Sequence, residues 1–101
     1  MDIRQLTYFI EVAKYRSFTK ASHILHLSQP TLSKMVKNLE DELEIDLIDR
    51  SSRQFEMAEA GEIVFEEGQV IIESLHNLST HLNDLMNLKK GTIKIGIPPL
   101  I

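Results

Sequence analysis

Two short helical patterns joined by one tight break, between residues 17 and 37, constrain the fold of this chain more than any other feature. Ser17 is placed to cap the first pattern, since a serine oxygen accepts a hydrogen bond from a free N–H of a helix's first turn. Ser28 stands in the same place before the second pattern, and Pro30 follows where the missing N–H of proline costs nothing. This arrangement is typical of a helix-turn-helix, whose second helix enters the major groove of DNA. The first hypothesis is therefore DNA recognition.

Length and composition limit the alternatives. With 101 residues, of which 43% are hydrophobic, the chain can form one small domain and an extension. It has no cysteine, which excludes disulfides and thiolate zinc sites. No apolar run approaches the roughly 18 residues of a membrane span, and the first residues carry acids inside their apolar pattern, unlike a signal peptide. We therefore expect a cytoplasmic protein that does not enter a membrane.

The net charge of −4 argues against a general binder of nucleic acids, which is usually basic. The charge is unevenly distributed, because residues 1–58 hold eight Lys or Arg against nine Asp or Glu, whereas residues 59–101 hold three against six. Five acids of the first part fall between residues 40 and 46, at the far end of the second helix of the motif, where we expect them to point away from phosphates. We expect DNA affinity to depend on correct docking more than on general attraction.

Three helical patterns supply the apolar faces of a small core. The first, within residues 3–15, follows Asp2 as a candidate cap, the second ends near residues 26–27, and the third begins after Ser28. Their apolar positions, in chain order, are Leu6, Phe9, Ile10 and Ala13; Phe18, Ala21, Ile24 and Leu25; and Leu32, Val36, Leu39 and Leu43. The opposite side of the third helix is polar, small and basic at its start, which suits a groove about 12 Å wide. Such a stripe alone is also typical of an ordinary solvated helix face.

The segment after the third helix reads as strand, polar turn and strand, over residues 47–50, 51–54 and 55–57. A hairpin directly after a recognition helix is a wing. Arg50 and Arg53 lie at its base and tip, where an arginine beside bound DNA can reach phosphates or the minor groove. The alternative is a surface hairpin with two solvated arginines.

From residue 59 an apolar repeat of seven residues indicates one long helix, which would measure about 45 Å at 1.5 Å per residue. A second series, which includes Gly68, is interleaved with the first. The residues that we expect at a dimer interface are Val64, Ile71, Leu75, Leu78, Leu82 and Leu85. A domain of 58 residues cannot cover such a row, so self-association is the simplest prediction. Packing of the helix against its own domain would account only for Ile63, Phe65 and the first turns.

The sequence Lys89-Lys90-Gly91 is a typical helix end, with cations in the last turn and a glycine after it. Residues 92–99 then alternate like a strand, although the chain offers no sheet for a single strand to join. We expect residues 91–101 to be the start of a further domain that this chain lacks.

As a set, the motifs resemble the N-terminal domain of LysR-type transcriptional regulators. The resemblance covers residues 1 to about 61, with the long helix and the final strand where that family has its linker helix and the start of its effector domain. The matching residues are Phe9, Ser17-Phe18, Ala21, Leu25, Ser28-Gln29-Pro30, Ser33, Leu39-Glu40, Leu43, Leu47, Arg50 and Glu59-Ala60-Gly61.

Four positions depart from the family's pattern. Ser22 stands where a second alanine is common, Ile48 where phenylalanine is usual, and Ala58 where threonine usually precedes Glu-Ala-Gly. Glu44 stands where a glycine usually ends the recognition helix, so the turn there must form without glycine's easy access to positive φ. Ala58 removes a usual N-cap of the linker helix, a role that would fall to Glu59 or be lost. We expect these departures to affect local geometry and not the polar face.

The resemblance implies a mainly α fold, a winged helix-turn-helix with a three-helix core and a two-stranded wing, followed by a long linker helix. The DNA-binding domain would be residues 1–58, with the helix-turn-helix at 18–37, the linker and dimerisation helix residues 59–90, and the start of the missing effector-binding domain residues 91–101. Members of the family regulate transcription by binding an inverted repeat of the T-N11-A type as homodimers through their linker helices. Tetramers are common in the full-length family, and a small-molecule effector would bind only the missing domain.

The resemblance also implies roles for individual residues. The residues expected at base edges are Gln29, Pro30, Ser33 and Lys34. Those expected near the DNA backbone are Phe18, Thr19 and Lys20, whose helix start presents N–H groups to a phosphate, together with Thr31 and Lys37. Arg50 and Arg53 would belong to the wing.

Two other classes of function compete with this hypothesis. An enzyme is disfavoured, because the sequence has no phosphate-binding glycine loop or nucleophile elbow, and no cofactor or metal is expected. Of the four histidines, His23 and His26 have a spacing possible for metal ligands, but no carboxylate accompanies them in their short helix. The second alternative is an oligomerisation or protein-interaction module without DNA binding. It would expose apolar anchors over residues 29–37, where the residues expected to face outward are small, polar and basic, and only Met35 is ambiguous.

Overall fold

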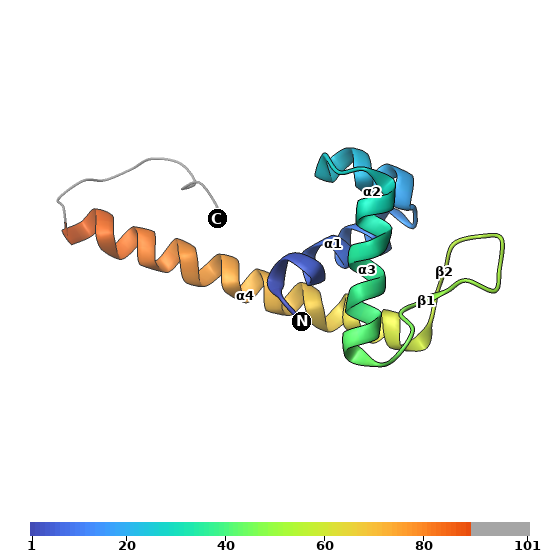
Figure 1. Cartoon of the computed structure of the whole chain (residues 1–101). Coiled ribbons are helices and arrows are strands. Elements are labelled where there is room, and N and C mark those ends of the chain that lie inside the picture. The colour runs from blue at the N-terminus through green and yellow to red at the C-terminus, as the bar shows by residue number, and fades with distance from the viewer. Residues whose placement is uncertain (90–101) are drawn as a thin grey trace. The chain divides into compact units, whose positions relative to one another are not determined.

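The computed structural model describes residues 1–89 and confirms the mainly α, winged helix-turn-helix prediction (Figure 1). The expected start of a further domain, at residues 91–101, lies outside the described residues. In chain order the elements are α1 (Ile3–Tyr15), α2 (Phe18–Leu25), α3 (Gln29–Leu43), β1 (Ile48–Asp49), β2 (Glu56–Met57) and α4 (Glu59–Lys89). No helix among residues 1–89 has the length and apolar character needed to cross a membrane.

The chain divides into two compact units, Met1–Gln69 and Val70–Ile101, so that the boundary falls inside α4. The first unit holds the three-helix core, the hairpin and the first turns of α4. The second unit, in its described part, is the remainder of α4 to Lys89. The boundary at residue 58, which we predicted between the DNA-binding domain and the linker helix, does not coincide with the boundary between the two compact units.

The predicted caps begin each of the first three helices. A side-chain oxygen accepts a hydrogen bond from a backbone N–H three residues further on in the pairs Asp2 and Gln5, Ser17 and Lys20, and Ser28 and Thr31. The Gln5 side chain also accepts from the Asp2 N–H, which completes a capping box. These caps satisfy N–H groups that a helix cannot pair internally, and they set where α1, α2 and α3 begin.

The first three helices all end on a non-glycine residue in the left-handed region. Arg16 has φ 51°, His26 has φ 56° and Glu44 has φ 58°. In each case the cap N–H bonds back to carbonyls of the last turn. Glu44 thus makes the turn after α3 without the glycine that usually stands there, and its side chain bears a steric cost that glycine avoids.

The core lies between α1, α2, α3 and the start of β1. Its fully or nearly fully buried residues are Phe9, Val12, Ala13, Ala21, Leu32, Val36, Leu39, Leu47 and Ile48. The expectation for Ile24 is wrong, because this side chain is 53% exposed. Successive helical residues differ by about 100° around the axis, so Leu25 occupies the inner side of α2 and Ile24 turns outward. Ser22 is buried where alanine is common, and its hydroxyl donates to the Thr19 carbonyl at 2.8 Å.

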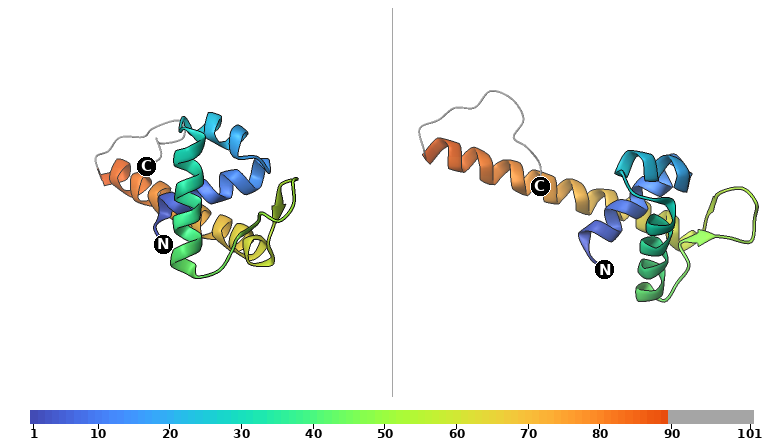
Figure 2. Two further views of the ribbon diagram at one scale, coloured as in Figure 1. Left: turned by 45° about the vertical axis from the view of Figure 1, so that its right-hand side comes forward. Right: turned by 45° about the horizontal axis from the view of Figure 1, so that its top comes forward.

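The wing, residues 48–57, is an antiparallel hairpin in which Ile48 pairs with Met57 and Asp49 with Glu56. Its strands are shorter than the sequence pattern suggested. The loop between them projects beyond the three helices, as two further views show (Figure 2). The wing therefore presents its loop residues to solvent beside the helices.

Two glycines bring α4 close to the rest of the first unit. A Cβ at Gly68 would lie 2.9 Å from a methyl carbon of Leu6 and 3.1 Å from one of Ile10, so Gly68 packs against α1. Gly61 lies even closer to the backbone of Leu47. The first turns of α4 consequently belong to the same core as the helix-turn-helix.

Candidate nucleic-acid interface

The start of α3 separates a buried apolar side from an exposed polar side. Leu32, Val36 and Leu39 are completely buried in the core. We call Gln29, Pro30, Ser33 and Lys34 the α3 polar face; Ser33 is half-buried and the other three are exposed. The predicted phosphate contacts Thr31 and Lys37 are also exposed on α3. Because the apolar side is held by the core, the polar side is fixed toward solvent.

Hydrogen bonds between side chains order the first turn of α3. The Thr19 hydroxyl, on α2, donates to Gln29 Oε1 at 3.3 Å. The Ser28 hydroxyl donates to Thr31 Oγ1 at 2.8 Å, which leaves the Thr31 hydroxyl hydrogen available as a donor. A carbonyl oxygen has two lone pairs, so Gln29 keeps one acceptor site and both amide hydrogens for a ligand. The starts of α2 and α3 therefore lie side by side, and one long hydrogen bond between exposed side chains joins Thr19 to Gln29.

An open hollow of about 380 Å³ lies between the starts of α2 and α3 and the wing. Of the sequence-predicted residues, it brings together Phe18, Thr19, Gln29, Arg50 and Arg53. A second hollow, of about 610 Å³, brings Lys37 to the side of the wing that carries Arg50 and Ser51. Arg50 lines both hollows, whereas the predicted backbone-contact residues Lys20 and Thr31 line neither of them.

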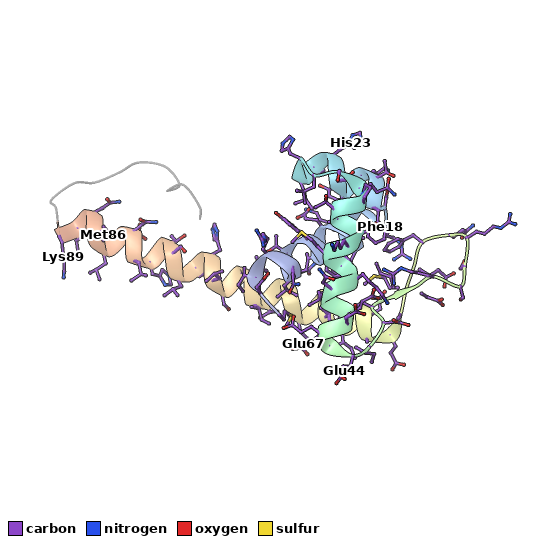
Figure 3. The ribbon with its side chains drawn as sticks, viewed as in Figure 1. Phe18, His23, Glu44, Glu67, Met86 and Lys89 are labelled. Carbon is purple, nitrogen blue, oxygen red and sulfur yellow. The ribbon has the colours of Figure 1, made fainter. Side chains whose placement is uncertain are left out.

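Phe18 is a packing residue, and its predicted role rests on its backbone N–H alone. Its ring lies edge-on to the ring of Phe55 on the wing, with centroids 6.3 Å apart and 60° between the planes. Figure 3 labels Phe18 on the side of the helices that faces the wing, whereas His23 lies at the other end of α2. The side chains of Thr19 and Lys20, which follow Phe18, are exposed.

Arg16 is a residue of this region that the sequence patterns did not single out. Its guanidinium lies 5.7 Å from the centre of the Phe55 ring, and the residue lines the same hollow as Arg53. A cation over an aromatic face is attracted by the ring quadrupole. The sequence signal was available, since Arg16 is a basic residue directly before the cap of α2, but nothing in the spacing placed it against the wing.

An ion pair between a buried carboxylate and a partly exposed guanidinium joins α3 to the wing. Glu40 is only 1% exposed, and its Oε1 lies 2.8 Å from the Arg50 guanidinium. Its Oε2 accepts from the backbone N–H of Leu47 at 2.7 Å and of Ile48 at 3.2 Å, and from Arg50 at 3.1 Å. Glu40 is one of the five acids that we expected to point away from phosphates, and it points into the protein. Glu40 faces inward because its carboxylate accepts hydrogen bonds from the N–H groups of Leu47 and Ile48 and pairs with the Arg50 cation.

The wing loop is ordered by short local hydrogen bonds. Asp49 Oδ1 accepts from the Ser51 hydroxyl at 2.5 Å and from the Ser51 N–H at 2.9 Å. These two bonds lower the pKa of the Asp49 carboxyl below its usual value, the hydroxyl having the larger effect. Arg53 is exposed on this loop, and among residues 1–89 no carboxylate lies within ion-pair distance of it. The loop thus holds an arginine that is open to a ligand.

The described part of the second unit carries an exposed apolar row. Ile71, Leu75, Leu78, Leu82 and Leu85 have exposed fractions of 46%, 37%, 55%, 52% and 50%. Val64, which we placed in the same series, is half-buried against the core of the first unit. Gly68 of the interleaved series likewise packs against α1. The exposed row therefore begins at Ile71.

Comparison with known proteins finds that most of the chain is similar to bacterial transcriptional regulators. Residues 3–62 match the family model described as "bacterial regulatory helix-turn-helix protein, lysR family". The HTH-type transcriptional regulator YwbI of Bacillus subtilis is 56% identical over 101 residues, which are 100% of this chain and 34% of that protein. The RuBisCO operon transcriptional regulator of Allochromatium vinosum is 37% identical over 97 residues, or 96% of this chain and 32% of that protein. The chain spans about a third of the length of these relatives.

Solved structures resemble the chain in the same way. The crystal structure of a BenM DBD/catB site 1 DNA complex has a TM-score of 0.82 and 31% identity, and the match covers 85% of this chain and 97% of that one. The crystal structure of CbnR, a LysR family transcriptional regulator, has a TM-score of 0.76 and 34% identity over 82% of this chain and 29% of that one.

Proposed function

Because this chain belongs to the LysR family of bacterial regulatory helix-turn-helix proteins, we propose that it binds double-stranded DNA with sequence preference and thereby regulates transcription. The observation that carries the proposal is the α3 polar face. It starts at a capped helix end, it is fixed outward by completely buried leucines and a valine, and it adjoins the start of α2 and the wing. Similar chains carry the names of transcriptional regulators, and one similar solved structure is a complex with DNA.

In the proposed complex, the start of α3 enters the major groove. Gln29 has both an acceptor and two donors, which suits an adenine edge, and Lys34 suits the acceptors of guanine. Pro30 and the small Ser33 allow the helix to approach closely. Thr31 and Lys37 would lie near phosphates, as would the N–H groups at the start of α2, around Phe18, Thr19 and Lys20.

The wing completes the proposed interface beside the groove. Of its two arginines, Arg50 pairs with Glu40, whereas Arg53 is exposed on the loop and is the cation that we place at a phosphate. Arg16 adds a further exposed cation at the edge of the first hollow. Phosphate contacts of this kind position a protein on DNA but do not read sequence.

We further propose that two copies of the chain bind one inverted repeat. The support is the exposed row from Ile71 to Leu85, which a second copy of the same helix would cover. A two-fold dimer presents two α3 helices to half-sites that lie about one turn of DNA apart. An inverted repeat of the T-N11-A type is the form of site that we propose. Control by a small molecule would require a further domain.

A protein-interaction module without DNA binding is not favoured, because the exposed side of α3 carries polar and basic residues where anchors of a protein interface are apolar. A gel shift with palindromic T-N11-A duplexes, and with random duplexes of the same length, tests the proposal. We expect a shift of the palindromic duplexes at lower protein concentration. No shift of any duplex at moderate salt would overturn it.

A further inference from the structure

We propose that Arg50 is a positioning residue of the wing, which acts through Glu40 to place Arg53 at the DNA and makes no DNA contact of its own. This inference rests on the proposed DNA binding, and it separates the roles of two arginines that the sequence treats alike. The observation behind it is that the Arg50 guanidinium already has a partner inside the protein, whereas Arg53 is open on the loop.

Arg50 is held by a carboxylate that cannot easily release it. Glu40 is 1% exposed, so its charge is almost entirely removed from water. A buried carboxylate is tolerated only when charges and hydrogen-bond donors surround it. Its partners are the guanidinium, at 2.8 Å and 3.1 Å, and the N–H groups of Leu47 and Ile48. If Arg50 turned to a phosphate, Glu40 would stay buried without the one cation that pairs with it among residues 1–89.

The ion pair between Glu40 and Arg50 connects α3 to the wing, two parts of the proposed interface whose relative position affects DNA binding. Glu40 lies on α3, about three turns after Gln29, while Leu47 and Ile48 lead into β1 and Arg50 follows β1 directly. The carboxylate therefore ties the recognition helix to the first strand of the wing. Arg53 comes three residues after Arg50, on a loop that is itself stiffened by the bonds between Asp49 and Ser51.

The second strand of the wing is held from another side. The Phe55 ring contacts the guanidinium of Arg16, the residue that ends α1, and lies edge-on to Phe18 at the start of α2. With β1 attached to α3 and Phe55 attached to α2, the loop between them has little freedom at either end. Arg53 is thus presented at a place that the two helices determine.

Removal of the Glu40 charge separates this proposal from simple electrostatics. DNA repels a carboxylate, so on charge alone Glu40→Gln should bind DNA as tightly as the unchanged chain or more tightly. If Glu40 positions the wing, the same substitution weakens binding. The matched control is Glu42→Gln, which removes the same charge two residues away on α3, from an exposed side chain without contact to the wing. We expect Glu40→Gln to raise the Kd for duplexes selected by the unchanged chain and Glu42→Gln to lower it slightly or leave it unchanged.

A double-mutant cycle between Arg50 and Arg53 gives the second test, and it needs only exposed or half-exposed positions. If Arg50 acts by placing Arg53, then Arg50→Ala weakens binding in the unchanged chain but has no further effect once Arg53 is alanine. The slope of log K against log salt should fall by about 1 per half-site in either single variant, and by no more in the double variant. Two independent phosphate contacts would instead give additive losses and a fall of about 2 per half-site.

Arg50→Lys keeps a cation at this position, so it replaces Arg50→Ala in the cycle if the alanine variant folds poorly. One nitrogen of Arg50, Nη1, makes both contacts with Glu40, so any loss of binding that lysine causes should likewise disappear once Arg53 is alanine. All variants are compared below their unfolding midpoints, measured by circular dichroism. Additive losses in the cycle, or a Glu40→Gln chain that binds as tightly as the Glu42→Gln chain, would overturn the inference while DNA binding by the unchanged chain stands. Failure of the unchanged chain to bind any duplex would instead overturn the proposed function.

Discussion

Gly61 and Leu47 approach so closely that a Cβ at Gly61 would lie 2.0 Å from the Leu47 carbonyl oxygen. The same oxygen accepts a hydrogen bond from the Ala58 N–H at 3.0 Å. The start of α4 is therefore seated on the backbone that enters the wing. Leu47 is also bound through its own N–H to Glu40, so one residue joins α3, β1 and α4.

Gly61→Ala tests this contact. Backbone atoms cannot move aside as a side chain does, so we expect the substitution to lower the free energy of unfolding by about 3 kcal/mol. Gly68→Ala is the control, because its neighbours are the ends of the Leu6 and Ile10 side chains. There the gain in helix propensity of about 1 kcal/mol should offset most of the crowding. Urea unfolding measures the free energy of unfolding of both variants. Equal losses of this free energy would show that the contact between Gly61 and the Leu47 backbone does not limit the size of residue 61.

The left-handed conformation of Glu44 gives a prediction of the opposite sign. Because Glu44 has φ 58°, Glu44→Gly should remove steric strain and raise the stability by about 1 kcal/mol. Figure 3 shows Glu44 at the end of α3 far from α2, so the change leaves the α3 polar face untouched. Glu42→Gly, inside the last turn of α3, should instead cost about 1 kcal/mol. A rise in melting temperature for the first variant alone is the expected result, and a fall for both would contradict the strain assigned to this turn.

Lys34 and Lys37 are expected to act differently on DNA. If Lys34 meets a base, Lys34→Ala should cost about 1–3 kcal/mol and relax the preference at one base pair in each half-site. Lys37→Ala should weaken binding on all sequences alike and reduce the salt slope by about 1 per half-site. Titrations of selected and random duplexes at several salt concentrations separate the two. An equal loss on both kinds of duplex for Lys34→Ala would make Lys34 a phosphate contact.

The row from Ile71 to Leu85 is expected to hold two copies together. Leu78→Asp combined with Leu82→Asp places charges in the middle of this row and should give a monomer. Both positions lie outside the first compact unit, so the helix-turn-helix should remain folded. Sedimentation gives the mass and circular dichroism the fold. An unchanged dimer would exclude this row as the interface.

Sequence patterns predicted the parts of this fold that depend on neighbours in the chain. The caps at Asp2, Ser17 and Ser28, the buried positions of α3 and the place of the hairpin all follow from local hydrogen bonding and helical period. The inward turn of Glu40 could not be predicted, because its cause is the N–H groups of Leu47 and Ile48, which become neighbours only when the chain folds.

The same limit applies to the candidate site. The Arg16 contact with Phe55 joins the turn before α2 to the wing, across 39 positions of sequence that carry no periodic relation. Val64 follows the repeat of seven residues and yet packs against the first unit, because the repeat marks an apolar side of α4 without saying what covers it. The outward face of α3 was predictable, since the period of one helix determines both of its sides.

Selection of bound duplexes from a random pool is the sharpest test of the proposal that the α3 polar face reads DNA as one half of a two-fold pair. The unchanged chain and the Lys34→Ala chain should be selected in parallel. We expect an inverted repeat with half-sites about one helical turn apart, and a loss of preference at one symmetric pair of positions in the variant. Recovery of duplexes without any common sequence would contradict the proposal. So would recovery of the same repeat by both chains with the same base preference at every position.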